Sequence, residues 1–184
     1  MKVRLTIAYE GTGYAGWQLQ KNGVSVQQGI EEAFACLLPD PVRLHSSSRT
    51  DAGVHAIGMV AHAEISEAEL RMPIAKLPLA LNAHLPEDIR IVAVKRVPST
   101  FHARFDAAGK QYRYYVWNHF AANPMLRRHA WLVHKTLNIP AMRRAAGHLL
   151  GKNDFVSFAG TRDYKMKSTV RTLSRCDVKR SGSL

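Results

Sequence analysis

The sequence contains few cysteines and no long apolar run, and these absences exclude whole classes of protein. Only two of the 184 residues are cysteines, and Cys36 and Cys176 lie far apart without the spacing of a metal or redox motif. A disulfide framework is therefore excluded. No stretch of about 18 apolar residues is present, and the first residues alternate polar and apolar side chains without a signal-peptide core. We expect a cytoplasmic protein that does not bind a membrane.

Acidic residues are also scarce, and the shortage lies in one part of the chain. The 14 Asp and Glu residues face 26 Lys and Arg residues, a formal charge of +12. Residues 1–100 hold ten of each kind, whereas residues 101–184 hold 16 basic and four acidic residues. This imbalance favours a phosphate backbone as the partner, and a solvated basic surface is the alternative. Tyr112, Tyr114 and Trp117 lie among these cations, which favours RNA because unstacked bases can lie on aromatic rings.

Strand-type alternation marks four segments of the first hundred residues. We expect strands at residues 2–10, 42–46, 54–65 and 89–97. In the first, apolar side chains from Val3 to Tyr9 recur at every second position, as in a strand with one buried face. In the third, Ile57, Met59, Ala61 and Ala63 recur in the same way.

Two helices are expected between these strands. Ser25 followed by Gln28 is a capping-box pattern, and the apolar stripe beyond it predicts a helix that stops at Pro39. Residues 74–82 predict a second helix with a kink or break at Pro78. The resulting order, β-α-β-β-α-β, is typical of a ferredoxin-like unit with two helices on one face of a sheet.

A second unit is expected to begin near residue 110 and to resemble the first. We expect a strand at residues 110–118, a helix at residues 138–150 and a strand at residues 170–178. Residues 180–183 then predict a hairpin turn without its return strand. The sequence therefore predicts an α+β protein of two ferredoxin-like halves, 1–107 and 108–184, with a mixed, mainly antiparallel sheet and a truncated second half.

The loop between the two central strands of the first half has the residue types of a catalytic site. It places Arg49 and Asp51 two positions apart and next to Gly53. A neighbouring guanidinium favours the charged carboxylate and fixes its orientation, which suits a nucleophile. The alternative is a loop aspartate in an ordinary turn with a weak surface ion pair.

These residues form part of a series of motifs that resembles the tRNA pseudouridine synthase A family. Tyr9–Gln20 resembles its opening motif, with Glu10 where the family has Asp, and Arg49–Ala56 matches its catalytic signature R-T-D-x-G-V-H-A. Further matching segments follow in family order at Asn82–Pro86, Phe101–Phe105, Tyr112–Tyr114 and Asn153–Phe158. The resemblance extends over essentially the whole chain.

The resemblance implies isomerisation of uridine to pseudouridine at positions 38 to 40 of the tRNA anticodon arm, without metal or organic cofactor. It implies that Asp51 is the nucleophile; attack at C1′, attack at C6 and a glycal route stay open. The target base must leave the stem, and the resemblance implies that Tyr112 stacks on it. A strand aromatic packed in the core is the alternative for Tyr112. By the same resemblance Arg49 contacts the tRNA and orients Asp51.

The resemblance also implies further tRNA contacts, a homodimer and a C-terminal segment that is missing here. The tRNA contacts would be Phe101, His102, Ala103, Arg104, Phe105, Arg162, Lys165 and Lys167. Family members continue into an F-x-x-x-M-V-R motif, and without it a truncated, non-catalytic tRNA-binding module is the alternative function. A metal site is not expected, because His45, His55 and His62 have neither helical nor zinc-ribbon spacing.

Overall fold

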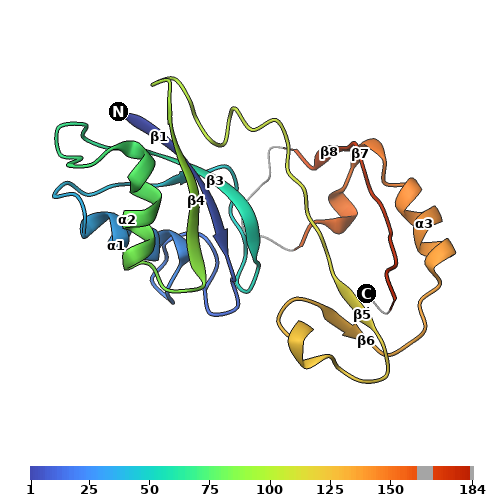
Figure 1. Cartoon of the computed structure of the whole chain (residues 1–184). Coiled ribbons are helices and arrows are strands. Elements are labelled where there is room, and N and C mark those ends of the chain that lie inside the picture. The colour runs from blue at the N-terminus through green and yellow to red at the C-terminus, as the bar shows by residue number, and fades with distance from the viewer. Residues whose placement is uncertain (161–167, 183–184) are drawn as a thin grey trace. The chain divides into compact units, whose positions relative to one another are not determined.

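The computed structural model describes residues 1–160 and 168–182, in two compact units, Met1–Gln111 and Tyr112–Leu184 (Figure 1). The first unit contains a four-stranded antiparallel sheet with strand order β2-β3-β1-β4. Its elements are β1 (Lys2–Tyr9), α1 (Val26–Ala35), β2 (His45–Ser46), β3 (Ala56–Glu64), the 3₁₀ turn η1 (Ile74–Lys76), α2 (Leu77–His84) and β4 (Ile89–Val97). The predicted β-α-β-β-α-β order of this unit is confirmed.

The central strand β1 separates the core from the open face of the sheet. Its buried residues alternate with partly exposed ones from Lys2 to Tyr9, as the sequence predicted. Val3, Leu5 and Ile7 are fully buried beneath α1 and α2, which lie on one face of the sheet (Figure 1). Burying each such side chain contributes about 1.5–3 kcal/mol, so this face supplies most of the unit's stability.

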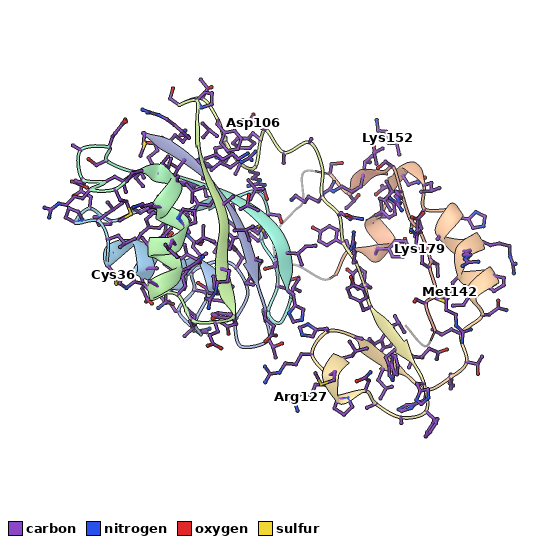
Figure 2. The ribbon with its side chains drawn as sticks, viewed as in Figure 1. Cys36, Asp106, Arg127, Met142, Lys152 and Lys179 are labelled. Carbon is purple, nitrogen blue, oxygen red and sulfur yellow. The ribbon has the colours of Figure 1, made fainter. Side chains whose placement is uncertain are left out.

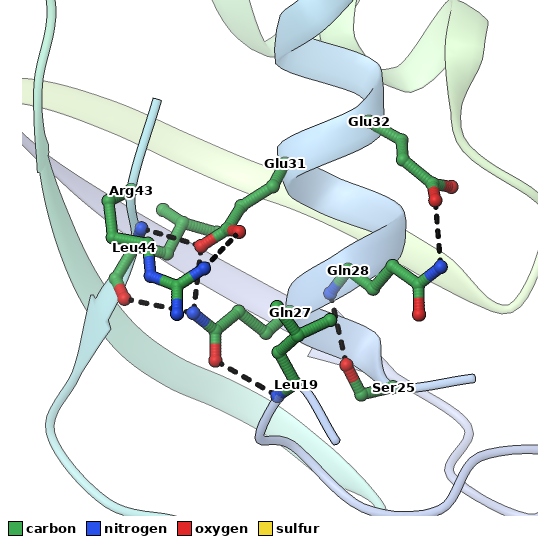
Figure 3. Close-up of polar contacts among 8 residues, drawn as sticks. All are labelled: Leu19, Ser25, Gln27, Gln28, Glu31, Glu32, Arg43 and Leu44. Carbon is green, nitrogen blue, oxygen red and sulfur yellow. Dashed lines mark hydrogen bonds and ion pairs between the residues drawn. The ribbon is translucent and has the colours of Figure 1, made fainter. Parts of the chain in front are cut away.

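Helix α1 begins at the cap that the sequence predicted, although the capping box is only half formed. The Ser25 hydroxyl accepts a hydrogen bond of 3.1 Å from the Gln28 amide (Figure 3). The Gln28 side chain does not return to the cap but donates to Glu32 at 2.8 Å. The helix ends at Ala35, four residues before Pro39, because Pro39 disfavours helical backbone at Leu38 and the last turn tightens.

Polar contacts also join α1 to the chain that enters β2 (Figure 3). Gln27 accepts from the Leu19 amide at 3.2 Å and donates to Glu31 at 2.7 Å. Glu31 in turn accepts from the Leu44 amide at 2.9 Å and pairs with Arg43 at 3.1 Å. These bonds satisfy the buried Gln27 side chain and fix the start of the β2–β3 hairpin on α1.

Two details of β3 and α2 differ from the sequence prediction. Ile57 was expected in the core with Met59, but its side chain is 84% exposed. The register between β1 and β3 shifts between Ile7 and Tyr9, so Ile57 lies at a bulge where the alternation is interrupted. The break expected at Pro78 falls before Leu77, and Pro78 occupies the first turn of α2, where no amide donor is needed.

The second unit consists of short elements. They are β5 (Val116–Asn118), the 3₁₀ turn η2 (Pro124–Leu126), β6 (Trp131–Val133), α3 (Ile139–Gly147), β7 (Gly151–Asp154), the 3₁₀ turn η3 (Val156–Phe158) and β8 (Val170–Leu173). β5 pairs with β6 in parallel, and β7 pairs with β8 antiparallel. Among the described residues of this unit, Ala146 is the single buried apolar side chain.

The strands predicted for this unit are longer than those observed. The expected strand at residues 110–118 is reduced to β5, because β6 offers only three partners. The expected strand at residues 170–178 ends at Leu173, because β7 is four residues long. The expected helix at residues 138–150 is α3, capped by the Asn138 side chain. The predicted turn at residues 180–183 is described only as far as Gly182.

Both cysteines are free thiols: Cys36 is exposed and Cys176 is partly exposed. In residues 1–160 and 168–182, no helix has the length and apolar character needed to cross a membrane.

Candidate active site

The loop between β2 and β3 carries Asp51, and hydrogen bonds to the residue before it fix its position. Tyr9 is the buried last residue of β1, and its hydroxyl lies 2.8 Å from the Thr50 hydroxyl. The Thr50 carbonyl accepts a hydrogen bond of 3.0 Å from the Trp17 amide. Both the side chain and the backbone of Thr50 are therefore bonded to the buried part of the first unit.

Glycines allow the chain after β1 to approach this loop closely. Gly16 has φ of +100°, and a Cβ atom there would lie 2.6 Å from the Thr50 carbonyl oxygen. A Cβ atom at Gly11 would lie 2.1 Å from the Val54 carbonyl oxygen. Both contacts are shorter than real Cβ atoms make, so only glycine fits at these two positions.

The loop is also bonded on the other side of Asp51. The Gly53 amide donates to the Tyr14 carbonyl at 3.4 Å, and the Val54 amide donates to the Asp51 carbonyl at 3.3 Å. Gly53 has φ of +78°, which turns the chain toward β3. Asp51 itself is exposed, so its carboxylate faces solvent from a loop that is bonded to the fold on both flanks.

Arg49 does not pair with Asp51 as the sequence spacing suggested. Both residues are exposed, and within the described part of the chain no ion pair joins them. An exposed pair of this kind gains little in water, so neither side chain is held by the other. The hydrogen bonds that hold the loop are made at Thr50, Gly53 and Val54.

The segment that supports the loop has a polar network of its own. The Gly11 amide donates to His55 Nδ1 at 3.1 Å, and Glu10 Oε1 lies 3.5 Å from the same nitrogen. Tyr14 donates its hydroxyl to Asp88 at 2.6 Å. Burial, together with this hydrogen bond to a carboxylate, raises the pKa of Tyr14, so its hydroxyl stays a donor at neutral pH.

The Phe101–Phe105 segment forms a compact turn after β4. The His102 carbonyl accepts from the amides of Phe105 and Asp106 at 3.1 and 2.9 Å, and the His102 amide donates to the Asp106 carboxylate at 2.8 Å. Ala103 is buried, whereas Arg104 and Phe105 are exposed. Of this predicted set, Arg104 and Phe105 present their side chains to solvent, with the guanidinium 6.0 Å from the ring centre.

His62 holds this turn against the sheet. Its Nδ1 accepts a hydrogen bond of 3.2 Å from the Ala103 amide, and its ring lies 4.7 Å from the His102 ring and 5.1 Å from the His45 ring. Burial, with the nearby positive groups of His102, His45 and Lys2, lowers the pKa of His62. In the described part of the chain, no set of three potential ligand side chains is arranged to hold a metal ion.

The remaining predicted site residues belong to the second unit. Tyr112 opens that unit and is 65% exposed, so it is not the buried strand aromatic of the alternative interpretation. Arg162, Lys165 and Lys167 lie outside the described residues. The basic residues Arg127, Lys152 and Lys179 lie on separate segments of this unit (Figure 2).

Sequence reasoning missed Tyr9, Thr50 and His62 as parts of the site. The alternation in β1 predicted that Tyr9 would be buried, but not that its hydroxyl would meet Thr50. The two residues are 41 positions apart, and local patterns carry no signal for such a contact. The sequence does indicate that a buried Tyr9 needs a hydrogen-bond partner for its hydroxyl, since buried tyrosine hydroxyls usually have one, but it does not indicate which residue that partner is.

Comparison with known proteins places these motifs in a family. A family model described as tRNA pseudouridine synthase matches residues 5–106, which include the Asp51 loop and the Phe101–Phe105 turn. Tyr112 lies beyond the residues that this model matches, but it lies within the part of the chain that aligns with individual relatives.

Three curated relatives, each named tRNA pseudouridine synthase A, are similar over both units. The chain is 41% identical to that of Geotalea uraniireducens over 181 residues, 98% of this chain and 72% of the relative. It is 42% identical to that of Geobacter sulfurreducens over 182 residues, 99% of this chain and 73% of the relative. It is 42% identical to that of Ruminiclostridium cellulolyticum over 177 residues, 96% and 71% respectively.

Proposed function

The chain belongs to the tRNA pseudouridine synthase family, and on this premise we propose that it isomerises uridine to pseudouridine in tRNA, with Asp51 as nucleophile. The observation that carries the proposal is the exposed carboxylate of Asp51 on a loop bonded to the fold at Thr50 and Gly53. A nucleophile must be accessible to its substrate and held in one place, and this loop meets both requirements.

The chemistry requires one positioned carboxylate and no net oxidant or reductant. The bond from N1 of uracil to C1′ breaks, the base rotates, and a bond from C5 to C1′ forms; C5 then loses its proton, and N1 gains one. Asp51 serves as the nucleophile by adding to C1′ or to C6, or it assists elimination to a glycal. Each route regenerates the Asp51 carboxylate at the end of the reaction, so no group of the enzyme is consumed in a catalytic cycle.

Tyr112 is proposed to stack on the flipped uracil. A uridine in a helical stem cannot be reached by a side chain, so the base must leave the stack, and an aromatic ring offsets the lost stacking by about 1–3 kcal/mol. The exposure of the Tyr112 ring supports this role, because a ring packed in a core has no free face.

The tRNA backbone is proposed to bind the basic side chains around the site. Arg49 and Arg104 are exposed in the first unit, and Phe101, His102, Ala103 and Phe105 complete the turn that presents Arg104. The second unit contains 14 Lys and Arg and three Asp and Glu residues, a formal charge of +11. Arg162, Lys165 and Lys167 belong to this set by sequence.

We further propose two related ferredoxin-like halves, a homodimer and the anticodon arm as the target. The strand order β2-β3-β1-β4 of the first unit supports the first half. The sequence of a strand, α3 and β8 in the second unit supports a counterpart with boundaries near residues 1–107 and 108–184. The likeness of Arg49–Ala56 to the family signature supports positions 38 to 40 of the anticodon arm as the target.

Release of tritium from tRNA labelled at C5 of its uridines tests the function. We expect the protein to release tritium and the Asp51→Asn variant to release none, because the amide cannot act as the nucleophile. The variant should bind the same tRNA within about twofold, since it keeps the shape of the loop. Mapping the pseudouridines in the product tests whether they lie at positions 38 to 40.

Two results would contradict the proposal. Equal release by the protein and by Asp51→Asn would exclude Asp51 as the nucleophile. No release by the protein, with tRNA still bound, would instead identify a tRNA-binding module without activity.

A further inference from the structure

We propose that Tyr9 is a positioning residue that holds Asp51 in place through the hydroxyl of Thr50. The inference rests on the proposed function, because it concerns the orientation of the proposed nucleophile. Tyr9 does not touch the substrate in this proposal; it acts only through Thr50, which directly precedes Asp51.

The position of Tyr9 is fixed by the sheet and the core. It is the last residue of β1, it is 4% exposed, and it is paired with Ala56 of β3 and Ile89 of β4. Its ring lies 6.0 Å from the Trp17 ring in the same core. A ring held by strands on both sides cannot shift without disturbing the sheet, so its hydroxyl is a fixed point.

Thr50 is held at two points by this anchored region. Its hydroxyl lies 2.8 Å from the Tyr9 hydroxyl, and its carbonyl accepts from the Trp17 amide at 3.0 Å. Gly16 brings the backbone close enough that even one methyl group would lie 2.6 Å from the Thr50 carbonyl oxygen. The Thr50 carbonyl is part of the planar peptide group that joins Thr50 to Asp51. Fixing this group therefore fixes the nitrogen and Cα atoms of Asp51, from which its carboxylate side chain extends.

The Tyr9 hydroxyl stays protonated and can therefore form a hydrogen bond with the Thr50 hydroxyl. Burial raises the pKa of Tyr9, and the hydrogen bond with Thr50 offsets only part of this effect. The phenol is therefore protonated at neutral pH, and the pair forms a hydrogen bond between two neutral groups. Such a bond constrains geometry without placing a second charge beside Asp51.

A small displacement of Asp51 would reduce the rate more than the binding. Misplacing a reacting group by about 1 Å can reduce a rate by about a hundredfold, whereas the exposed surfaces that hold the tRNA are unchanged. We therefore expect Tyr9→Phe to lower kcat for tritium release by about tenfold or more and to change KM by less than about twofold.

The test combines kinetics with a measurement that does not require turnover. Tyr9→Phe, Thr50→Val and the double variant are compared in the tritium assay, with hydrogen–deuterium exchange of residues 47–55 measured in parallel. If one hydrogen bond acts, the double variant loses no more than either single variant. Exchange in the loop should rise by about tenfold in all three, and Thr50→Ser, which keeps the hydroxyl, should restore both kcat and slow exchange.

Ile30→Val serves as the stability-matched control. Ile30 is a fully buried residue of α1, and shortening it removes one buried methylene group without changing any residue of the loop. It should lower Tm as Tyr9→Phe does but leave kcat and loop exchange unchanged. This control separates the loss of positioning from a general loss of stability.

Unchanged loop exchange in Tyr9→Phe would overturn the inference, whatever the protein catalyses. Additive losses of kcat in the double variant would also overturn it. Failure of the proposed function looks different, because the unmodified protein would then release no tritium while Tyr9→Phe still loosened the loop.

Discussion

His62 is a buried histidine whose neutral form the fold requires. Its Nδ1 accepts a hydrogen bond from the Ala103 amide, and a protonated ring would lose that acceptor. His45 on β2, His102 on the following turn and Lys2 on β1 add positive charge around the ring, and Glu64 pairs with Lys2 at 3.3 Å. Burial of the ring, together with these positive charges, lowers the pKa of His62 from its usual 6.5.

This lowered pKa predicts that acid destabilises the first unit. Below pH 6.5 the unfolded chain takes up the His62 proton more readily than the folded chain does, so the free energy of unfolding falls as pH falls toward the folded pKa. Above pH 6.5 the contribution is complete. We expect Tm to fall between about pH 7 and pH 5, measured by thermal unfolding.

The His62→Asn variant isolates this effect. Its amide oxygen can accept the Ala103 hydrogen bond near the position of Nδ1, but it does not titrate. The variant differs from the protein only at this position, so a shallower loss of Tm on acidification in the variant reports the contribution of His62. Equal losses in the two proteins would show that His62 makes no contribution.

At the residue scale, sequence patterns predicted burial better than contacts. Period-two alternation correctly placed Val3 to Tyr9 in the core and failed at Ile57, where a bulge changes the register. The motif placed Asp51 on a loop beside Arg49, but it did not predict the hydrogen bonds of Thr50 and Gly53 that hold the loop. Backbone bonds between distant segments leave no periodic trace in a sequence.

At the scale of elements, α1 depends on the hydrogen bond at its N-terminus. Ser25 is fully buried and its hydroxyl accepts from the Gln28 amide, which would otherwise be an unsatisfied helix donor. We expect Ser25→Ala to lower the free energy of unfolding by about 1 kcal/mol, measured by urea denaturation. The loss arises from the unpaired amide rather than from lost volume.

Gln28→Ala is the matched control for this prediction. The Gln28 side chain bonds to Glu32 on the exposed surface of α1 and not to the cap, so removing it should cost less than about 0.5 kcal/mol. A loss equal to that of Ser25→Ala would mean that the complete capping box forms in solution.

Most elements of the first unit were predictable because they have strong local signals, although the strand expected at residues 42–46 is reduced to His45–Ser46. β1 alternates, α1 begins with a capping serine, and β4 is rich in β-branched residues. The second unit lacks such signals: its strands have three or four residues, and their lengths depend on which partners lie alongside. Pairing of this kind depends on distant residues, so the predicted strands at residues 110–118 and 170–178 were too long.

At the scale of the whole molecule, core and charge are divided between the two units. All buried apolar residues of the described chain except Ala146 lie within residues 1–111. The first unit has 12 basic and 11 acidic residues, a formal charge of +1, whereas the second has +11. The first unit thus contains the hydrophobic core and the proposed nucleophile, and the second contains the charge that attracts a polyanion.

This division predicts that the first unit folds without the second. A chain of residues 1–111 keeps the four-stranded sheet, both helices and the cluster that runs from Val3 to Ile91. We expect it to unfold in one cooperative transition, followed by circular dichroism, with Tm within about 5 °C of the main transition of the full chain. Residues 101–106 must be included, because they cover His62. A broad, non-cooperative transition would mean that the sheet needs the second unit to fold.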